Sequence, residues 1–140
     1  MNTRRHSIAD VKALLQSRVR DLVRELAPDG AWQGHTWSAR NPTRDDRKRG
    51  SFAVWTTGSA IGAWKDFATG DKGDIIQLIQ YCRGLAETKD ALAWAENWLG
   101  IARIPDHEIK RAQAAAKERE AKAAKDDAAK AERQARGAFA

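Results

Sequence analysis

The chain has 140 residues, of which 42% are hydrophobic and 31% are charged, and this length suits one domain of ordinary size. It contains no run of 18 apolar residues, so we expect no transmembrane helix, and no apolar stretch follows the charged N-terminus as a secretory signal would require. The net charge of +6 permits a polyanionic partner, although solubility explains that charge equally well.

Cys82 is the only cysteine in the chain. A single thiol excludes an internal disulfide framework and any zinc site that uses two cysteines. Chains without disulfides are typical of reducing compartments, so we expect a cytoplasmic location.

Two regions of the chain differ sharply in composition. Residues 1–104 carry all six tryptophans and nine of the ten glycines, whereas residues 106–140 consist almost entirely of Ala, Lys, Glu, Arg, Gln and Asp. This predicts a compact module over residues 1–104 and a charged, Ala-rich helical tail or linker over residues 105–140.

The first predicted element is a helix over residues 8–27. Ser7 is a good N-cap residue, and Asp10 follows three positions later with the carboxylate that a capping box needs. Apolar residues then recur every three or four positions, at Ile8, Val11, Leu15, Val19, Leu22 and Leu26. The sequence Pro28-Asp29-Gly30 predicts the end of this helix and a turn.

Three short extended segments follow, over residues 31–39, 51–57 and 60–67. The second alternates between two faces, with Phe52 and Val54 on one and Ala53 and Trp55 on the other. Together the segments predict a small antiparallel sheet of about three strands flanked by helices, which is an α+β fold. A long basic loop over residues 40–50 joins the first two strands.

Two more helices and the tail complete the predicted elements. Gly73-Asp74 opens one helix, which Gly84 closes as a left-handed C-cap, and a second helix runs from Thr88 to Gly100. The tail has strong helix formers but no Leu, Ile or Val after Ile109, so a stable coiled coil is not expected. A solvated single helix or a linker is expected instead.

The sequence lacks the motifs of a catalytic site. No HExxH, paired-cysteine or GxSxG motif is present, and the three histidines fall in different predicted segments, at His6, His35 and His107. Gly70-Asp71-Lys72-Gly73 precedes a helix but lacks the spacing of a phosphate-binding loop. Asp45 and Asp46 stand among arginines and lysines, which favours local charge neutralisation over a metal site. We therefore predict a non-catalytic chain without a metal or a cofactor.

The basic loop over residues 40–50 carries five basic and two acidic side chains. Basic side chains neutralise phosphates, and aromatic rings carried by a sheet stack on unpaired bases. The candidate nucleic-acid-binding residues are therefore Arg40, Arg44, Arg47, Lys48, Arg49, Lys65, Trp55 and Trp64. Two alternatives stay open. The basic loop can be a solvated surface without a ligand, and each tryptophan can be packed in the core.

The order of several motifs points to a known family. Asn41-Pro42 is followed by Gly50-Ser51-Phe52-Ala53-Val54, then by Trp64-Lys65-Asp66-Phe67, and then by Gly73-Asp74-Ile75-Ile76 at the start of an apolar helix. Over residues 8–100 this order resembles the N-terminal zinc-binding domain of bacterial and phage DNA primases, in a cysteine-free form. Such domains often precede a Toprim catalytic domain or a helicase. The resemblance implies a zinc-ribbon-like module that engages a template strand.

The metal ligands of that family are missing from this chain. The resemblance puts its second cysteine pair at Asp66 and Thr69 and its first Cys-Pro at Asn41-Pro42, so no thiolate remains at these positions. We expect a fold without structural zinc, in which tryptophan packing stabilises the module.

Together these features predict a module that binds single-stranded or template DNA within a phage or mobile-element primase and replication system. The expected partners are single-stranded DNA or a primer-template and a primase or helicase catalytic domain, without a membrane. The alternative is a protein-interaction adaptor or inhibitor that keeps the fold without binding DNA. Affinity for single-stranded DNA that falls steeply with salt would separate the two.

Overall fold

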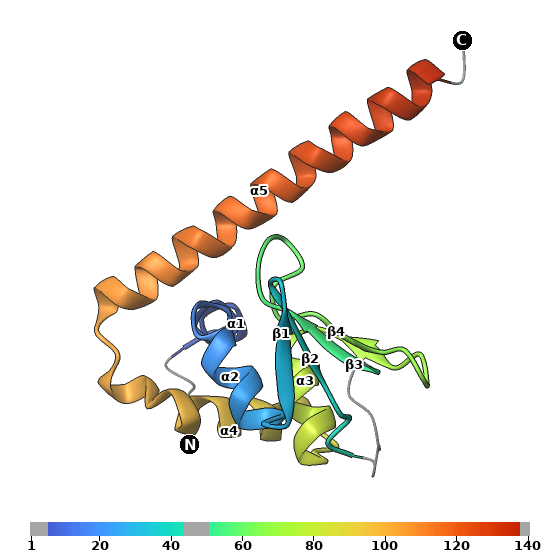
Figure 1. Ribbon diagram of the computed structural model, residues 1–140. Helices are drawn as coiled ribbons and strands as arrows, with labels where there is room; N and C mark the ends of the chain where they lie inside the picture. The colour runs from blue at the N-terminus through green and yellow to red at the C-terminus, as the bar shows by residue number, and fades with distance from the viewer. Residues whose placement is uncertain (1–5, 44–50, 138–140) are drawn as a thin grey trace.

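An antiparallel sheet packed against helices forms the α+β fold of the computed structural model, which describes residues 6–43 and 51–137 (Figure 1). The elements in chain order are α1 (Ile8–Ser17), α2 (Val19–Leu26), β1 (Gly30–Gln33), β2 (Thr36–Ala39), β3 (Phe52–Trp55), β4 (Trp64–Asp66), β5 (Lys72–Gly73), α3 (Ile75–Arg83), α4 (Thr88–Leu99), the 3₁₀ turn η1 (Ile101–Arg103) and α5 (Asp106–Gly137).

The sheet has five strands in the described residues, in the order β1-β2-β3-β4-β5, and every neighbouring pair is antiparallel. The expectation of about three strands was therefore too low. The segment over residues 31–39 is a hairpin, because Gly34 adopts a φ of +62° and reverses the chain between β1 and β2. The fifth strand, β5, has only two residues, which is too short for any alternation to show in the sequence.

Alternation along the strands gives the sheet an inner and an outer face. The inner face carries the buried side chains Trp37, Ala39, Phe52, Val54 and Trp64. The apolar residues of α1 to α4 cover this face and complete the core. The outer face carries the intervening positions, namely Ala31, Thr36, Ser38, Ala53, Trp55, Lys65 and Lys72.

The N-terminal helical segment begins as predicted, with a capping box between Ser7 and Asp10. The prediction of one continuous helix over residues 8–27 was wrong, because the segment breaks into α1 and α2 at Arg18. The Ser17 hydroxyl donates to the Leu14 carbonyl at 2.6 Å, which competes with the helical backbone pattern. The Arg18 guanidinium meanwhile donates to the carbonyl of Leu99, at the end of α4.

The next two helices lie where the sequence predicts them. Asp74 and Gln77 form a capping box at the start of α3, and Gly84 ends that helix in the left-handed conformation. Gly100 ends α4 in the same way, although the N-cap of α4 is Glu87 and its side chain makes no cap hydrogen bond.

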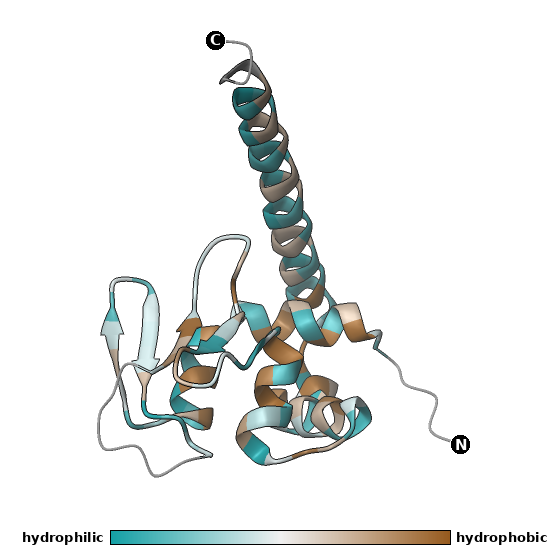
Figure 2. Cartoon of the chain, turned by 90° about the vertical axis from the view of Figure 1, so that its right-hand side faces the viewer, coloured by the Kyte–Doolittle hydropathy of each residue, from teal (hydrophilic) through white to brown (hydrophobic). Residues whose placement is uncertain are grey.

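The C-terminal helix α5 covers the predicted tail, but its first turns belong to the core. Ile109 and Ala112 are at most 7% exposed and pack with the residues of the core. Polar contacts with α1 extend this packing, as Gln113 donates to Asp10 and Arg119 donates to Gln16. Residues 124–135 are exposed, and Figures 1 and 2 show this part of α5 projecting away from the module. None of the helices in the described part of the chain is both long and apolar enough to cross a bilayer.

Candidate nucleic-acid interface

Three side chains of the outer sheet face line one cleft of about 480 Å³, namely Trp55, Lys65 and Lys72. The strand register explains why they meet. Lys65 lies opposite Ala53 on one side and opposite Lys72 on the other, so the two lysines are cross-strand neighbours. Trp55 stands two positions after Ala53 in the same strand and therefore on the same face.

The Lys65–Lys72 pair places two positive charges opposite each other on neighbouring strands. Like charges directly opposite each other on a sheet destabilise it. Within residues 6–43 and 51–137, neither ammonium group has a carboxylate partner. The Lys65 ammonium lies 5.2 Å from the centroid of the Phe67 ring. Such an arrangement attracts an anion, because an anion would relieve the repulsion between the two lysines.

Phe67 is the most exposed large hydrophobic residue in the described part of the chain, with 59% of its surface accessible. Its backbone is fixed, because its amide donates to the Ser51 carbonyl at 2.7 Å and so continues the pairing of β3 with β4. The ring is therefore presented to solvent from a rigid backbone, next to Lys65. Sequence reasoning missed Phe67 and Lys72. The available signal was the Lys65-x-Phe67 spacing, which places both side chains on one side of an extended strand.

Trp64 belongs to the core and is excluded from the candidate interface. It is 4% exposed, its indole N–H donates to the Asp74 carbonyl at 3.1 Å, and its ring centroid lies 4.5 Å from that of Tyr81. Trp64 borders the same cleft, but so little of its surface is accessible that the core-packing alternative is favoured for this residue. Trp55 is partly exposed, and its side chain lines the cleft.

The remaining sequence candidates are the basic side chains of residues 40–50. Arg40 is half-exposed, and its guanidinium pairs with the carboxylate of Asp29 at 3.2 Å. The other candidates lie outside the described residues, namely Arg44, Arg47, Lys48 and Arg49. In the sequence they directly precede Gly50 and Ser51, and Ser51 is the residue whose carbonyl anchors Phe67.

A buried polar cluster joins the three positions that the family resemblance assigned to metal ligands. Asn41 donates to the Asp66 carboxylate at 2.5 Å and to the Tyr81 hydroxyl at 2.8 Å. The other Asp66 oxygen accepts from the backbone amides of Ala68 and Thr69, at 2.7 and 3.2 Å. Asn41 and Asp66 are at most 1% exposed.

These residues do not fit a zinc ion. A structural zinc site needs four ligands, usually thiolates and imidazoles, and here an amide and a hydrogen-bonded carboxylate take their places. The cluster links Asn41, at the start of the basic loop, to Asp66 and the turn after β4. A metal ion with ligands from both segments would link them in the same way. The rings of Phe52, Trp64 and Tyr81 pack together alongside, with centroids 4.5 to 6.1 Å apart.

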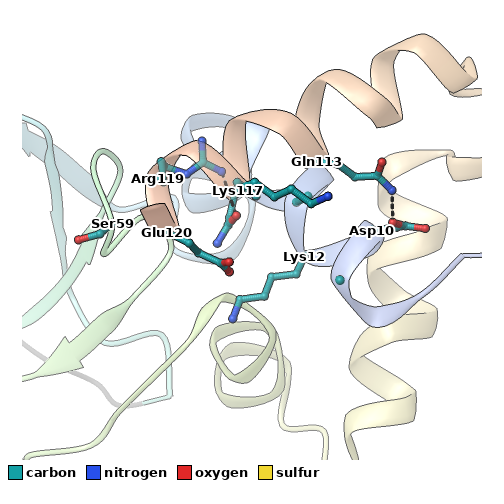
Figure 3. A pocket seen from close by; sticks show the side chains of 11 residues that line it. Asp10, Lys12, Ser59, Gln113, Lys117, Arg119 and Glu120 are labelled. Carbon is teal, nitrogen blue, oxygen red and sulfur yellow. Dashed lines mark hydrogen bonds between the residues drawn. The ribbon is translucent and has the colours of Figure 1, made fainter. Parts of the chain in front are cut away.

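A second cleft, of about 450 Å³, lies between α1, α5 and the β3–β4 connection (Figure 3). Its charges are mixed, since Lys12, Lys117 and Arg119 face Asp10 and Glu120 around it. The side-chain hydrogen bond from Gln113 lowers the pKa of Asp10 below its usual value of 3.8.

The described residues give no grouping of side chains suited to a metal or to a reactive thiol. No three His, Cys, Asp or Glu side chains among them are placed to hold a metal ion. Burial raises the pKa of the Cys82 thiol to about 12, so the reactive thiolate is scarce at neutral pH.

Comparison with protein-family models, with curated proteins and with solved structures gave no match for the chain. The candidate function therefore depends on the geometry of the outer sheet face and on the motif order in the sequence.

Proposed function

We propose that the chain binds single-stranded nucleic acid, and DNA in particular, through the outer face of β3, β4 and β5. The observation that carries this proposal is the placement of the Lys65–Lys72 pair between two accessible aromatic rings, Trp55 and Phe67. Lysines attract the phosphates, and the rings stack on bases that have no pairing partner.

The separation of the two rings suits an extended strand. The Trp55 amide donates to the Ala63 carbonyl, so Trp55 lies beside Ala63 on the neighbouring strand. Phe67 follows Ala63 by four residues. At about 3.3 Å per residue, the backbone positions of the two rings are therefore about 13 Å apart along the strand direction. Lys65 lies midway between them. A single strand lying along this line would meet a ring, a cation and a second ring in turn.

We further propose that the chain serves as a non-catalytic accessory module of a phage or mobile-element primase and replication system. The motif order over residues 8–100 supports this role. The contact between Asn41 and Asp66 adds support, because the resemblance assigns both positions to ligands that a zinc ion would bring together. Catalysis would come from a primase or helicase domain as partner, and the basic side chains of residues 44–49 would add phosphate contacts.

A salt titration with a fluorescent oligo(dT) tests the proposal. Anisotropy should report binding whose affinity falls steeply with salt, and the variant Lys65→Gln/Lys72→Gln should bind more weakly. Losing two phosphate contacts should reduce the slope of log K against log salt by about 1.4, since each contact to a single strand contributes about 0.7.

The matched control is Lys122→Gln/Lys125→Gln, which removes the same charge from the exposed part of α5. It should leave both affinity and slope unchanged. Equal losses in the two double variants would mean that only net charge matters, and would count against the outer face. No measurable binding by the wild-type chain would favour the alternative of a protein-interaction adaptor.

A further inference from the structure

β1 is one of the two edge strands of the sheet in the described residues, at the margin nearest α2 in Figure 1. The backbone carbonyl of Asp29 accepts a hydrogen bond from the backbone amide of Arg40, and the register then places Ala31 opposite Ser38. The odd-numbered residues of β1 therefore direct their backbone groups toward β2. In an antiparallel ladder the intervening residues direct their amide and carbonyl groups the other way. The backbone groups of Gly30 and Trp32 therefore point outward from the sheet.

Two arginines of α2 lie against this edge. The Arg20 guanidinium carbon is 4.2 Å from the Trp32 ring centroid, and that of Arg24 is 5.8 Å from it. Trp32 is in turn held by Trp37, with ring centroids 4.9 Å apart in an edge-to-face arrangement. The indole therefore positions both guanidinium groups beside the outward-pointing backbone of β1.

Neither Arg20 nor Arg24 has a carboxylate partner within the described part of the chain, and both side chains are exposed. They are four residues apart on one helix, a spacing at which like charges repel. A ligand that brings carboxylates to this place would satisfy both guanidinium groups through charge-assisted hydrogen bonds.

We propose that the edge of β1 binds an extended acidic segment of a partner protein as an added strand. The residue opposite Trp32 would point to the same face as the indole, toward Arg20 and Arg24. Alternate residues of the segment should therefore be Asp or Glu. This surface is distinct from the outer face that we assign to nucleic acid, so the two proposals can fail separately.

The backbone of β1 favours a peptide over a nucleic acid at this edge. Outward amide and carbonyl groups at Gly30 and Trp32 offer donors and acceptors in the alternation that a second β-strand matches. A phosphodiester chain could use the two arginines but would leave the carbonyl groups without donors. The edge is only four residues long, so the arginines must supply much of the selectivity.

A synthetic peptide of alternating Thr and Asp is the probe that tests this inference. Added to the ¹⁵N-labelled full chain, it should shift the amide resonances of Gly30 and Trp32. The variant Arg20→Gln/Arg24→Gln should bind it about tenfold more weakly or worse, since two charge-assisted hydrogen bonds are lost. The control variant Lys110→Gln/Arg111→Gln, which alters exposed positions of α5, should bind as the wild type does.

Two control peptides separate strand addition from simple charge attraction. The same peptide with Asn in place of Asp should bind weakly, and the Asp peptide with N-methylated backbone amides should also bind weakly. Equal binding by either control, or no shift at Gly30 and Trp32, would overturn the inference. A loss of oligo(dT) affinity in the arginine variant without a loss of peptide affinity would assign this edge to nucleic acid instead.

Discussion

Exchanging the amide and the carboxylate of the buried polar cluster tests how much this cluster stabilises the fold. In Asp66→Asn, the oxygen that accepts from Asn41 can become an amide nitrogen, so that two donors face each other at a buried position. The oxygen that accepts from Ala68 and Thr69 can keep its role. The substitution therefore removes one hydrogen bond to a charged acceptor and leaves one buried donor without a partner.

The expected loss of free energy of unfolding is about 2–3 kcal/mol, because a hydrogen bond to a charged group contributes about 1.5–3 kcal/mol. For a domain of this size that loss corresponds to a fall of about 10 °C in melting temperature. The single variant Asn41→Asp should be destabilised as well, since it places two carboxylates in contact.

The double variant Asn41→Asp/Asp66→Asn restores one donor and one acceptor between the two positions. The Tyr81 hydroxyl, which now accepts from Asn41 and donates to Asp71 at 3.3 Å, can turn to donate to the new carboxylate. Urea unfolding followed by circular dichroism should therefore show the double variant to be more stable than the sum of the single losses predicts. Strictly additive losses would refute the reasoning that this hydrogen bond holds the loop to the turn.

Two further predictions concern α5 and its contact with α1. Removing residues 106–140 should lower the free energy of unfolding by about 2–3 kcal/mol, because Ile109 is buried, whereas removing residues 124–140 should leave urea unfolding unchanged. Equal stability of both truncated chains would show that α5 does not stabilise the core. Asp10→Asn should lower the melting temperature at neutral pH. Folding lowers the pKa of Asp10, so its charged carboxylate stabilises the folded state above pH 3.8, the usual pKa of aspartate. That difference should vanish as the pH falls through the lower folded-state value, and a difference that persists in acid would contradict this assignment.

Local signals in the sequence predicted the helices well. Capping residues such as Ser7 and Asp74 act within four residues of a helix end, so they can be recognised without knowing the tertiary structure. The break at Arg18 could not be predicted in this way, because the guanidinium donates to the carbonyl of Leu99, which is 81 residues away. The docking of α5 was missed for the same reason, since its apolar contact with the core depends mainly on Ile109 and small alanines.

The candidate site was predicted in part. Residue types identified Trp55 and Lys65, and the outer sheet face brings both to one cleft. Strand register decides which side chains join them, and register cannot be read from a two-residue strand such as β5, so Lys72 was missed. Burial decided against Trp64, because hydropathy does not distinguish a tryptophan of the core from one at the surface.

The most direct test of nucleic-acid binding by the outer face is the affinity of Phe67→Ala for labelled oligo(dT) at one fixed salt concentration. The ring is 59% exposed, so its removal should leave the melting temperature nearly unchanged. If the ring stacks on a base, the binding free energy should weaken by about 1–3 kcal/mol. Wild-type affinity in Phe67→Ala, measured where the wild-type chain binds, would contradict the proposal that this face holds the strand.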